Sequence, residues 1–159
     1  MGQLVGMNTA VIRREVFEQL GGFDESMRIG EDYLFWLKVS RVFEMHALAG
    51  TVALYRNHEL SAMRRLGKPN HLAIMLKTAV SRWGLSNPDG TNLDQGEFNI
   101  RLASTEFDHG YNHFWWGSAV VALRSMFNSL RGGFRPARSL TYIALLPVRN
   151  LLPRLRHRS

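Results

Sequence analysis

The sequence predicts a mixed α/β chain, with a short α/β region in residues 1–66 followed by a mainly helical region in residues 67–159. Three observations predict this class. Apolar residues recur at helical spacing before residue 43, short apolar runs replace that spacing between residues 45 and 56, and helical spacing returns after residue 69. With 159 residues, 45% of them hydrophobic, the chain can bury one ordinary core or form part of a larger one.

The first predicted helix covers residues 13–20. Val16 and Leu20 follow Ile12 at spacings of four, which places the three side chains on one helical face. The glycine pair at residues 21–22 comes next, and glycine commonly supplies the left-handed residue that ends a helix. We therefore expect the chain to turn sharply there.

A second helix is expected from Gly30 to about Phe43, because leucines and aromatic residues occupy more than one of its faces. Its first turn holds two acidic residues, Glu31 and Asp32. The unpaired backbone N–H groups and the helix dipole at that end favour negative charge. Both carboxyl groups should therefore be ionised.

Two strands, or one strand with a bend, are expected next. The apolar runs at residues 46–49 and 52–55 are short, and Gly50 separates them. Helical periodicity is lost across both runs. They supply the β part of the predicted class.

The mainly helical region begins with an amphipathic helix. Pro69 occupies its expected first position, and apolar residues follow at spacings of three and four up to Trp83. Residues 84–96, rich in Gly, Asn, Asp and Pro, should form a loop. Two or three further helices are expected, at about residues 93–107, 111–130 and 138–152, the last with a break at Pro147.

Positive charge is concentrated in the last third of the chain. The formal net charge is +7, all 13 acidic residues lie before residue 109, and residues 109–159 contain eight arginines and no acidic residue. Such a segment attracts phosphate groups, on lipid headgroups or on nucleic acid, in a salt-dependent way. A solvated basic surface with no partner is the alternative.

Aromatic residues are interleaved with these arginines. They could lie in a membrane interface, or they could pack the helices together, and the sequence leaves both readings open. The longest charge-free run, residues 110–123, is shorter than the ~20 residues that span a bilayer, so no transmembrane helix is expected. The aromatic residues concerned are Trp115, Trp116, Phe127, Phe134 and Tyr142.

Cysteine is absent, which excludes a disulfide framework and thiolate metal sites and fits a reducing compartment. Residues 1–10 show no basic segment followed by a long apolar run, so no signal peptide is expected. We therefore expect a cytoplasmic location, with the basic tail resting on the inner face of the cytoplasmic membrane.

Several short motifs follow one another in a fixed order between residues 6 and 61. The basic pair RR at residues 13–14 precedes the turn GGFDE at residues 21–25, and the acidic pair Glu31-Asp32 opens the next helix. The segment YRNHELS at residues 55–61 comes last. This order resembles the second half of the catalytic domain of family 2 glycosyltransferases, over about a third of the chain.

The resemblance implies a partial GT-A fold, a Rossmann-like α/β domain that lacks its nucleotide-binding half. It also implies that Asp32 is the catalytic base of an inverting sugar transfer, in which an acceptor hydroxyl loses its proton as it attacks the anomeric carbon. By the same resemblance Glu31 shapes the acceptor pocket and Trp36 stacks on the acceptor sugar. The residues alone leave two alternatives open, namely Asp32 as a helix cap and Trp36 as part of the core.

The resemblance further implies a source of positive charge for the departing diphosphate. Arg56 and His58 match a loop that contacts the diphosphate in the family, and His58 could complete a site for a divalent metal, Mn²⁺ or Mg²⁺. The Asp-x-Asp motif that holds the metal in the family is absent from this sequence. We therefore expect the nucleotide-binding half to precede Met1, and the isolated chain neither to bind a nucleotide-sugar tightly nor to turn it over.

The expected function is that of a fragment of an inverting glycosyltransferase of the cell-surface polysaccharide type. It would transfer a sugar from a nucleoside-diphosphate sugar to a glycan or lipid-linked acceptor. The alternative is a non-catalytic basic helical adaptor that binds anionic membrane or nucleic acid. Nucleic acid is the less favoured partner, because the tail aromatics fall at apolar helical positions and form no evident stacking platform.

Overall fold

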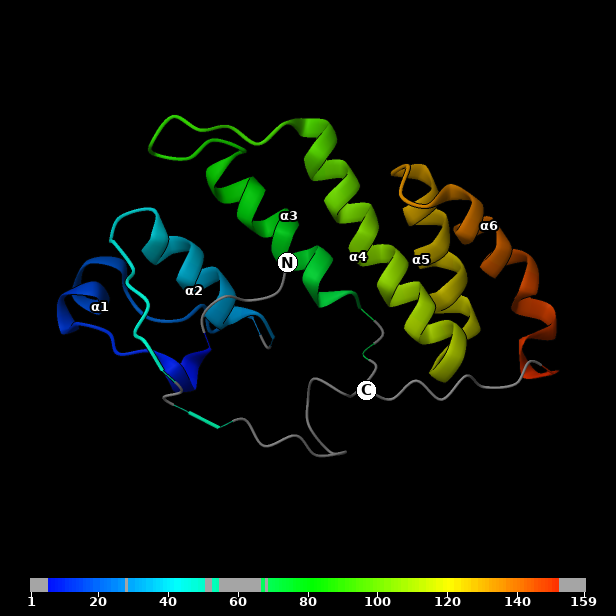
Figure 1. Cartoon of the computed structure of the whole chain (residues 1–159), viewed down its shortest axis with the longest axis horizontal. Coiled ribbons are helices and arrows are strands. Elements are labelled where there is room, and N and C mark those ends of the chain that lie inside the picture. Colours follow the sequence, from blue (N-terminus) through cyan, green and yellow to red (C-terminus); the bar gives the residue numbers. More distant parts are fainter. Residues whose placement is uncertain (1–5, 28, 51–52, 55–66, 68, 152–159) are drawn as a thin grey trace. The chain divides into compact units, whose positions relative to one another are not determined.

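The computed structural model describes residues 6–27, 29–50, 53–54, 67 and 69–151, and this part of the chain is helical (Figure 1). The described residues form two compact units. The first takes its residues from Met1–Ser61 and Met75–Asn92, and the second from Ala62–Ile74 and Leu93–Ser159. The elements, in chain order, are η1 (Met7–Thr9), α1 (Arg14–Leu20), α2 (Glu31–Ser40), α3 (His71–Trp83), α4 (Gln95–Trp116), α5 (Ala119–Arg131), α6 (Pro136–Leu145) and η3 (Leu146–Leu151).

The expected α/β class, and with it the partial GT-A fold, is wrong for the part of the chain that the structure describes. No strand forms there, and an isolated antiparallel bridge joins Ser86 to Asn92. Residues 46–49, expected to be a strand, are exposed and irregular. A strand is stabilised by a partner strand and by burial of one face, and residues 46–49 have neither within the described residues. The second expected strand, at 52–55, lies partly outside those residues.

The core of the first unit is built by α1 and α2. Val16 of α1 packs against Phe35, Trp36 and Val39 of α2, and all four side chains are buried. The ring of Phe17 stacks on that of Phe35, with 5.2 Å between the ring centroids. Burial of these apolar surfaces holds two short helices together that would not be stable alone in water.

The ends of α1 and α2 agree in part with the helix ends predicted from the sequence. Gly21 adopts a left-handed φ of 72°, and its N–H donates to the carbonyl oxygen of Phe17 at 2.9 Å, which confirms the predicted glycine cap. The start of α2 is predicted to within one residue, but its end is wrong, because the helix stops at Ser40 and not at Phe43. The N–H of Phe43 still reaches the carbonyl of Val39 at 2.8 Å.

Helix α3 begins two residues later than expected. Asn70, and not Pro69, immediately precedes the helix, and Oδ1 of Asn70 accepts the N–H of Ala73 at 3.2 Å in the manner of an N-cap. The helix is divided between the two units. Residues 71–74 belong to the second unit and residues 75–83 to the first.

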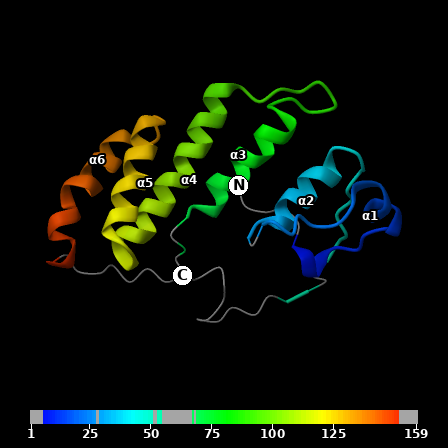
Figure 2. The same cartoon turned by 180° about the vertical axis from the view of Figure 1, so that it is seen from behind.

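The second unit contains α4, α5 and α6, which lie side by side in both views (Figure 2). Asp94 caps α4, as its side chain accepts two backbone N–H groups of the first turn. A Cβ at Gly110 would lie 3.2 Å from the backbone nitrogen of Met126, so glycine permits the close approach of α4 to α5. The break expected between residues 107 and 111 is therefore absent. It falls instead between Trp116 and Ala119.

The C-terminal end of the described chain closes back on α4. Helix α6 passes into η3 after Leu145, which confirms the break predicted at Pro147. The guanidinium of Arg149 donates three hydrogen bonds, of 3.0, 3.2 and 3.1 Å, to carbonyl groups at the C-terminal end of α4, where few backbone N–H groups remain to bond them. The acceptors are the carbonyl oxygens of His113, Phe114 and Gly117.

Several tail aromatics pack the second unit. The ring of Tyr142 meets Phe107, Tyr111 and Phe114 edge to face, at 6.1, 5.4 and 5.0 Å between centroids. This favours the packing alternative for Tyr142, whereas Phe127 of α5 is exposed. Among the described helices, none has the length and apolar character needed to cross a membrane.

Candidate functional site

The expected catalytic base lies in the first turn of α2. Gly30 is the N-cap, and no side chain caps the helix there. Asp32 is therefore the second residue of the helix and not its N-cap. Its Oδ1 accepts the backbone N–H of Tyr33 at 2.8 Å, and the side chain is partly exposed. Asp32 thus satisfies one first-turn N–H group and remains within reach of a molecule in solvent.

Gly30 sets the geometry of this turn. Its φ of 90° lies in the left-handed region, which favours glycine. A Cβ at this position would also lie 3.1 Å from Sδ of Met75 in α3. The acidic first turn of α2 therefore follows a backbone conformation and a packing contact that both favour glycine.

Glu31 carries a polar atom that the described residues leave unsatisfied. Its Oε2 is buried and has no hydrogen-bond partner in the described part of the chain. A buried carboxylate oxygen without a donor is unfavourable, because it has lost its hydration and gained nothing in exchange. A hydroxyl or amide of a bound molecule would supply the missing donor.

Trp36 does not present its ring for sugar stacking. The residue is 8% exposed and belongs to the core between α1 and α2. Its ring packs edge to face on Phe35, with 5.4 Å between the ring centroids. The expected stacking role for Trp36 is therefore corrected to the core-packing alternative, because an acceptor sugar could reach the ring only by displacing its apolar neighbours.

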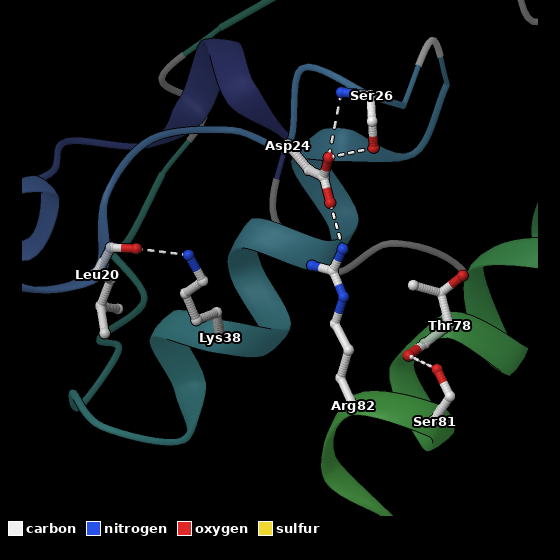
Figure 3. Close-up of polar contacts among 7 residues, drawn as sticks. All are labelled: Leu20, Asp24, Ser26, Lys38, Thr78, Ser81 and Arg82. Atoms are coloured by element: carbon white, nitrogen blue, oxygen red, sulfur yellow. Dashed lines mark hydrogen bonds and ion pairs between the residues drawn. The ribbon is translucent and has the colours of Figure 1, made fainter.

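The turn that follows α1 is fixed by Asp24 (Figure 3). One carboxylate oxygen of Asp24 accepts the backbone N–H of Ser26 at 3.1 Å and also the hydroxyl of Ser26. The other oxygen forms an ion pair with the guanidinium of Arg82 in α3. Asp24 therefore ties the GGFDE turn to α3 within the first unit.

These contacts stabilise the charged form of Asp24. Hydrogen bonds from Ser26 and from Arg82 lower the pKa of Asp24 to about 2. A carboxyl group so stabilised stays ionised at neutral pH and is a poor proton acceptor. Asp24 therefore has a structural role, which differs from the role of catalytic base expected of Asp32.

Lys38 also serves the fold of the first unit. Its Nζ donates to the carbonyl oxygen of Leu20, the last residue of α1, as Figure 3 shows. Cations near the C-terminal end of a helix interact favourably with the helix dipole and the unpaired carbonyls. Lys38 thereby caps α1 from α2.

The remaining expected site residues cannot be placed. Arg56 and His58 both lie outside the described residues. Within the described residues, no group of three or more His, Cys, Asp or Glu side chains could hold a metal ion. The donor set for the expected Mn²⁺ or Mg²⁺ is therefore not supplied by this part of the chain.

A shallow hollow of about 420 Å³ lies elsewhere in the first unit. It is lined by residues 40–44, at the C-terminal end of α2, and by residues 87–89 of the loop after α3. Arg41 borders it and donates to the carbonyl oxygen of Ser86 at 3.0 Å. The hollow is at the opposite end of α2 from Glu31 and Asp32, so it is not the acceptor pocket expected from the sequence.

Sequence reasoning missed the link between Asp24 and Arg82. A local signal existed, because Asp followed two residues later by Ser commonly forms a turn in which the Asp side chain bonds the backbone. The ion pair joins residues far apart in the sequence, and no local pattern predicts it. The Oε2 atom of Glu31, which has no partner among the described residues, is likewise a feature of the folded chain that no local pattern predicts.

The described geometry comprises an acidic helix start, a buried carboxylate oxygen, and a neighbouring turn fixed by an ion pair. Comparisons with protein-family models, with curated proteins and with solved structures found no match to this chain.

Proposed function

We propose that this chain supplies the acceptor-side part of an inverting glycosyltransferase, which moves a sugar from a nucleoside-diphosphate sugar to a hydroxyl of a glycan or lipid-linked acceptor. The observation that carries the proposal is the first turn of α2. There, the partly exposed carboxylate of Asp32 adjoins Glu31, whose buried Oε2 lacks a donor in the described residues. The order of the sequence motifs supports the same reaction class, and the proposal does not depend on an α/β fold.

Asp32 is the proposed base. The acceptor oxygen attacks the anomeric carbon while its proton passes to the Asp32 carboxylate. The new C–O bond forms as the bond from the anomeric carbon to the diphosphate oxygen breaks, and the nucleoside diphosphate leaves with the bonding electrons. The hydrogen bond from the N–H of Tyr33 to Oδ1 of Asp32 orients the carboxylate.

Glu31 is the proposed binding residue for the acceptor. A second hydroxyl of the acceptor would donate to the buried Oε2 and supply the partner that this oxygen lacks in the described residues. Arg56 and His58 are proposed to contact the departing diphosphate. A bound Mn²⁺ or Mg²⁺ would neutralise the negative charge that develops there.

A transfer assay tests the base. The protein is purified in the form that its own cells produce, because the isolated chain alone is expected to show no transfer. It is incubated with a panel of nucleotide-sugars and acceptors in Mn²⁺ or Mg²⁺. Asp32→Asn keeps an oxygen for the Tyr33 N–H but cannot accept the proton, so transfer should fall by about a hundredfold or more. Near-normal transfer by Asp32→Asn would contradict the assignment.

Asp94→Asn is the matched control. It makes the same chemical change at a helix start, and Asn caps a helix about as well as Asp. Transfer by Asp94→Asn should equal that of the wild type. Glu31→Gln should raise KM for the acceptor more than it lowers kcat, because Glu31 is proposed to bind the acceptor and not to take the proton.

A non-catalytic adaptor that binds an anionic membrane is the second candidate. The exposed apolar and basic face of α5 favours it. In both candidates the protein attaches peripherally to the inner face of the cytoplasmic membrane through its basic C-terminal region. The candidates differ in the transfer assay, because an adaptor shows no activity that Asp32→Asn could remove.

A further inference from the structure

Helix α5 exposes apolar side chains on one side and buries a mixed set of residues on the other. Its buried residues are Ala122, Ser125 and Ser129, which are small or hydroxyl-bearing, and Met126. On its exposed side, Val120 is 76% exposed, Phe127 45% and Leu123 38%. Large apolar residues gathered on an exposed face mark a surface that binds something.

These residues form one continuous stripe with two arginines. Val120, Arg124, Phe127 and Arg131 follow one another at spacings of four, three and four, and Leu123 lies beside them. At 3.6 residues per turn the five residues fall within an arc of about 100°. The buried residues of α5 occupy the opposite side. We call the five residues the outer face of α5.

The charge of this face is not neutralised locally. Arg124 and Arg131 are both exposed, and in the described residues neither forms an ion pair. The segment from residue 109 to residue 159 contains no acidic residue. Two other arginines of the second unit are engaged within it, since Arg149 bonds the end of α4 and Arg135 lies over the rings of Phe107 and Phe134.

The chemistry of the outer face selects among possible partners. A second copy of the chain that docked through the same face would set arginine against arginine. A nucleic acid would pair with the arginines but would offer nothing apolar to the aliphatic side chains of Val120 and Leu123. An anionic lipid surface offers phosphates to the arginines and an apolar interior to the other residues.

We propose that the outer face of α5 docks on an anionic phospholipid surface, an inference that rests on the membrane attachment proposed above and identifies the face responsible. Val120, Leu123 and Phe127 enter the interfacial region. Arg124 and Arg131 contact lipid phosphates. The helix then lies in the plane of the membrane, with its buried side facing the rest of the second unit.

Co-sedimentation with vesicles tests this face. The chain is mixed with vesicles of phosphatidylcholine containing phosphatidylglycerol and, separately, with vesicles of phosphatidylcholine alone. The wild type should bind the anionic vesicles in a salt-sensitive way. Arg124→Gln with Arg131→Gln should weaken that binding by roughly tenfold or more, and Val120→Ser with Phe127→Ser should weaken it to a similar degree. Phe127→Trp, which suits an interface, should bind more tightly.

Two controls match these changes. Arg13→Gln with Arg14→Gln removes the same charge from exposed positions in the first unit, and Ile100→Ser removes an exposed apolar residue from α4, where Ile100 is 52% exposed. Both controls should bind the anionic vesicles like the wild type. Equal loss of binding in the arginine control would show that only the total charge matters, and equal loss in Ile100→Ser would show that any exposed apolar residue matters; either result overturns the inference.

Other outcomes overturn it in distinguishable ways. If the wild type binds and both α5 variants bind equally well, the face is wrong and the membrane attachment stands. If only the arginine variant loses binding to vesicles, the apolar residues do not dock. The same conclusion follows if the chain prefers duplex DNA to vesicles and the serine variant still binds the DNA. If the wild type binds no vesicles, the membrane attachment fails as well. The Asp32→Asn assay reports on sugar transfer independently of all these results.

Discussion

At the scale of single residues, Asp24 and Asp32 both lie near the start of α2 but have different contacts. Asp24 is bound by Ser26 and by Arg82, and these contacts hold it in its charged form. Asp32 accepts the backbone N–H of the residue that follows it. The contacts of Asp24 join the turn to α3, whereas Asp32 lies in the partly exposed first turn of α2.

The pH dependence of stability tests the role of Asp24. Its pKa is lowered to about 2 in the folded chain. A solvated Asp has a pKa of about 3.9, so the contribution of Asp24 is complete above about pH 4 and is lost as the pH falls toward 2. Arg82→Gln should lower the urea midpoint above pH 4 and make it fall less steeply below pH 4. Arg101→Gln, a control in α4, should keep the wild-type profile, and an unchanged profile in Arg82→Gln would contradict the link.

Gly30→Ala tests the start of α2. Alanine at a φ of 90° is strained, and its Cβ would crowd Met75, so the free energy of unfolding should fall by about 1–2 kcal/mol. Gly22→Ala is the matched control, because Gly22 has no positive φ and a Cβ there would meet nothing within 4 Å. Urea denaturation measures both. Equal stability of the two variants would argue against the packing described for the first turn of α2.

At the scale of elements, local sequence patterns predicted the helices. The same patterns gave wrong predictions where contacts between distant segments determine the structure. The cap at Gly21 and the start of α2 follow from residues close in sequence. The strand expected at 46–49 failed because a strand depends on a partner that the sequence pattern does not contain. The break expected between residues 107 and 111 failed as well, because Gly110 lies inside α4, where close approach to Met126 favours glycine.

In the candidate site, too, local sequence patterns predicted some features and did not predict others. The position of Asp32 in the first turn of α2 was predicted from the acidic pair and the apolar run behind it. The burial of Trp36 depends on Val16 of α1, and the ion pair of Asp24 depends on α3. Contacts of this kind form between segments distant in sequence, so helical periodicity carries no information about them.

Arg149→Gln tests the closure of α4. The three hydrogen bonds from Arg149 satisfy carbonyl groups at the C-terminal end of α4, so their loss should lower the free energy of unfolding by about 1–3 kcal/mol. Arg138→Gln, at an exposed position in α6, should change it by less than about 0.5 kcal/mol. Thermal unfolding followed by circular dichroism makes the comparison. A midpoint for Arg149→Gln equal to that of Arg138→Gln would contradict the closure.

At the scale of the whole molecule, the chain is organised as two units built from interleaved segments. Residues 75–92 complete the first unit, although they follow residues that belong to the second. Arg82 binds Asp24, and the guanidinium of Arg41 lies 5.9 Å from the ring centroid of Trp83. The first unit therefore depends on α3.

Fragments of the chain test this organisation and the domain boundary predicted after residue 66. A fragment of residues 1–66 lacks Met75, Arg82 and Trp83, so it should show no cooperative thermal transition. A fragment of residues 1–92 contains every described segment of the first unit and should unfold cooperatively. Residues 67–159, which contain α3 to α6, should remain helical as a positive control. If residues 1–66 unfold cooperatively at the same midpoint as residues 1–92, then α3 contributes nothing to the first unit, and the boundary after residue 66 is the correct one.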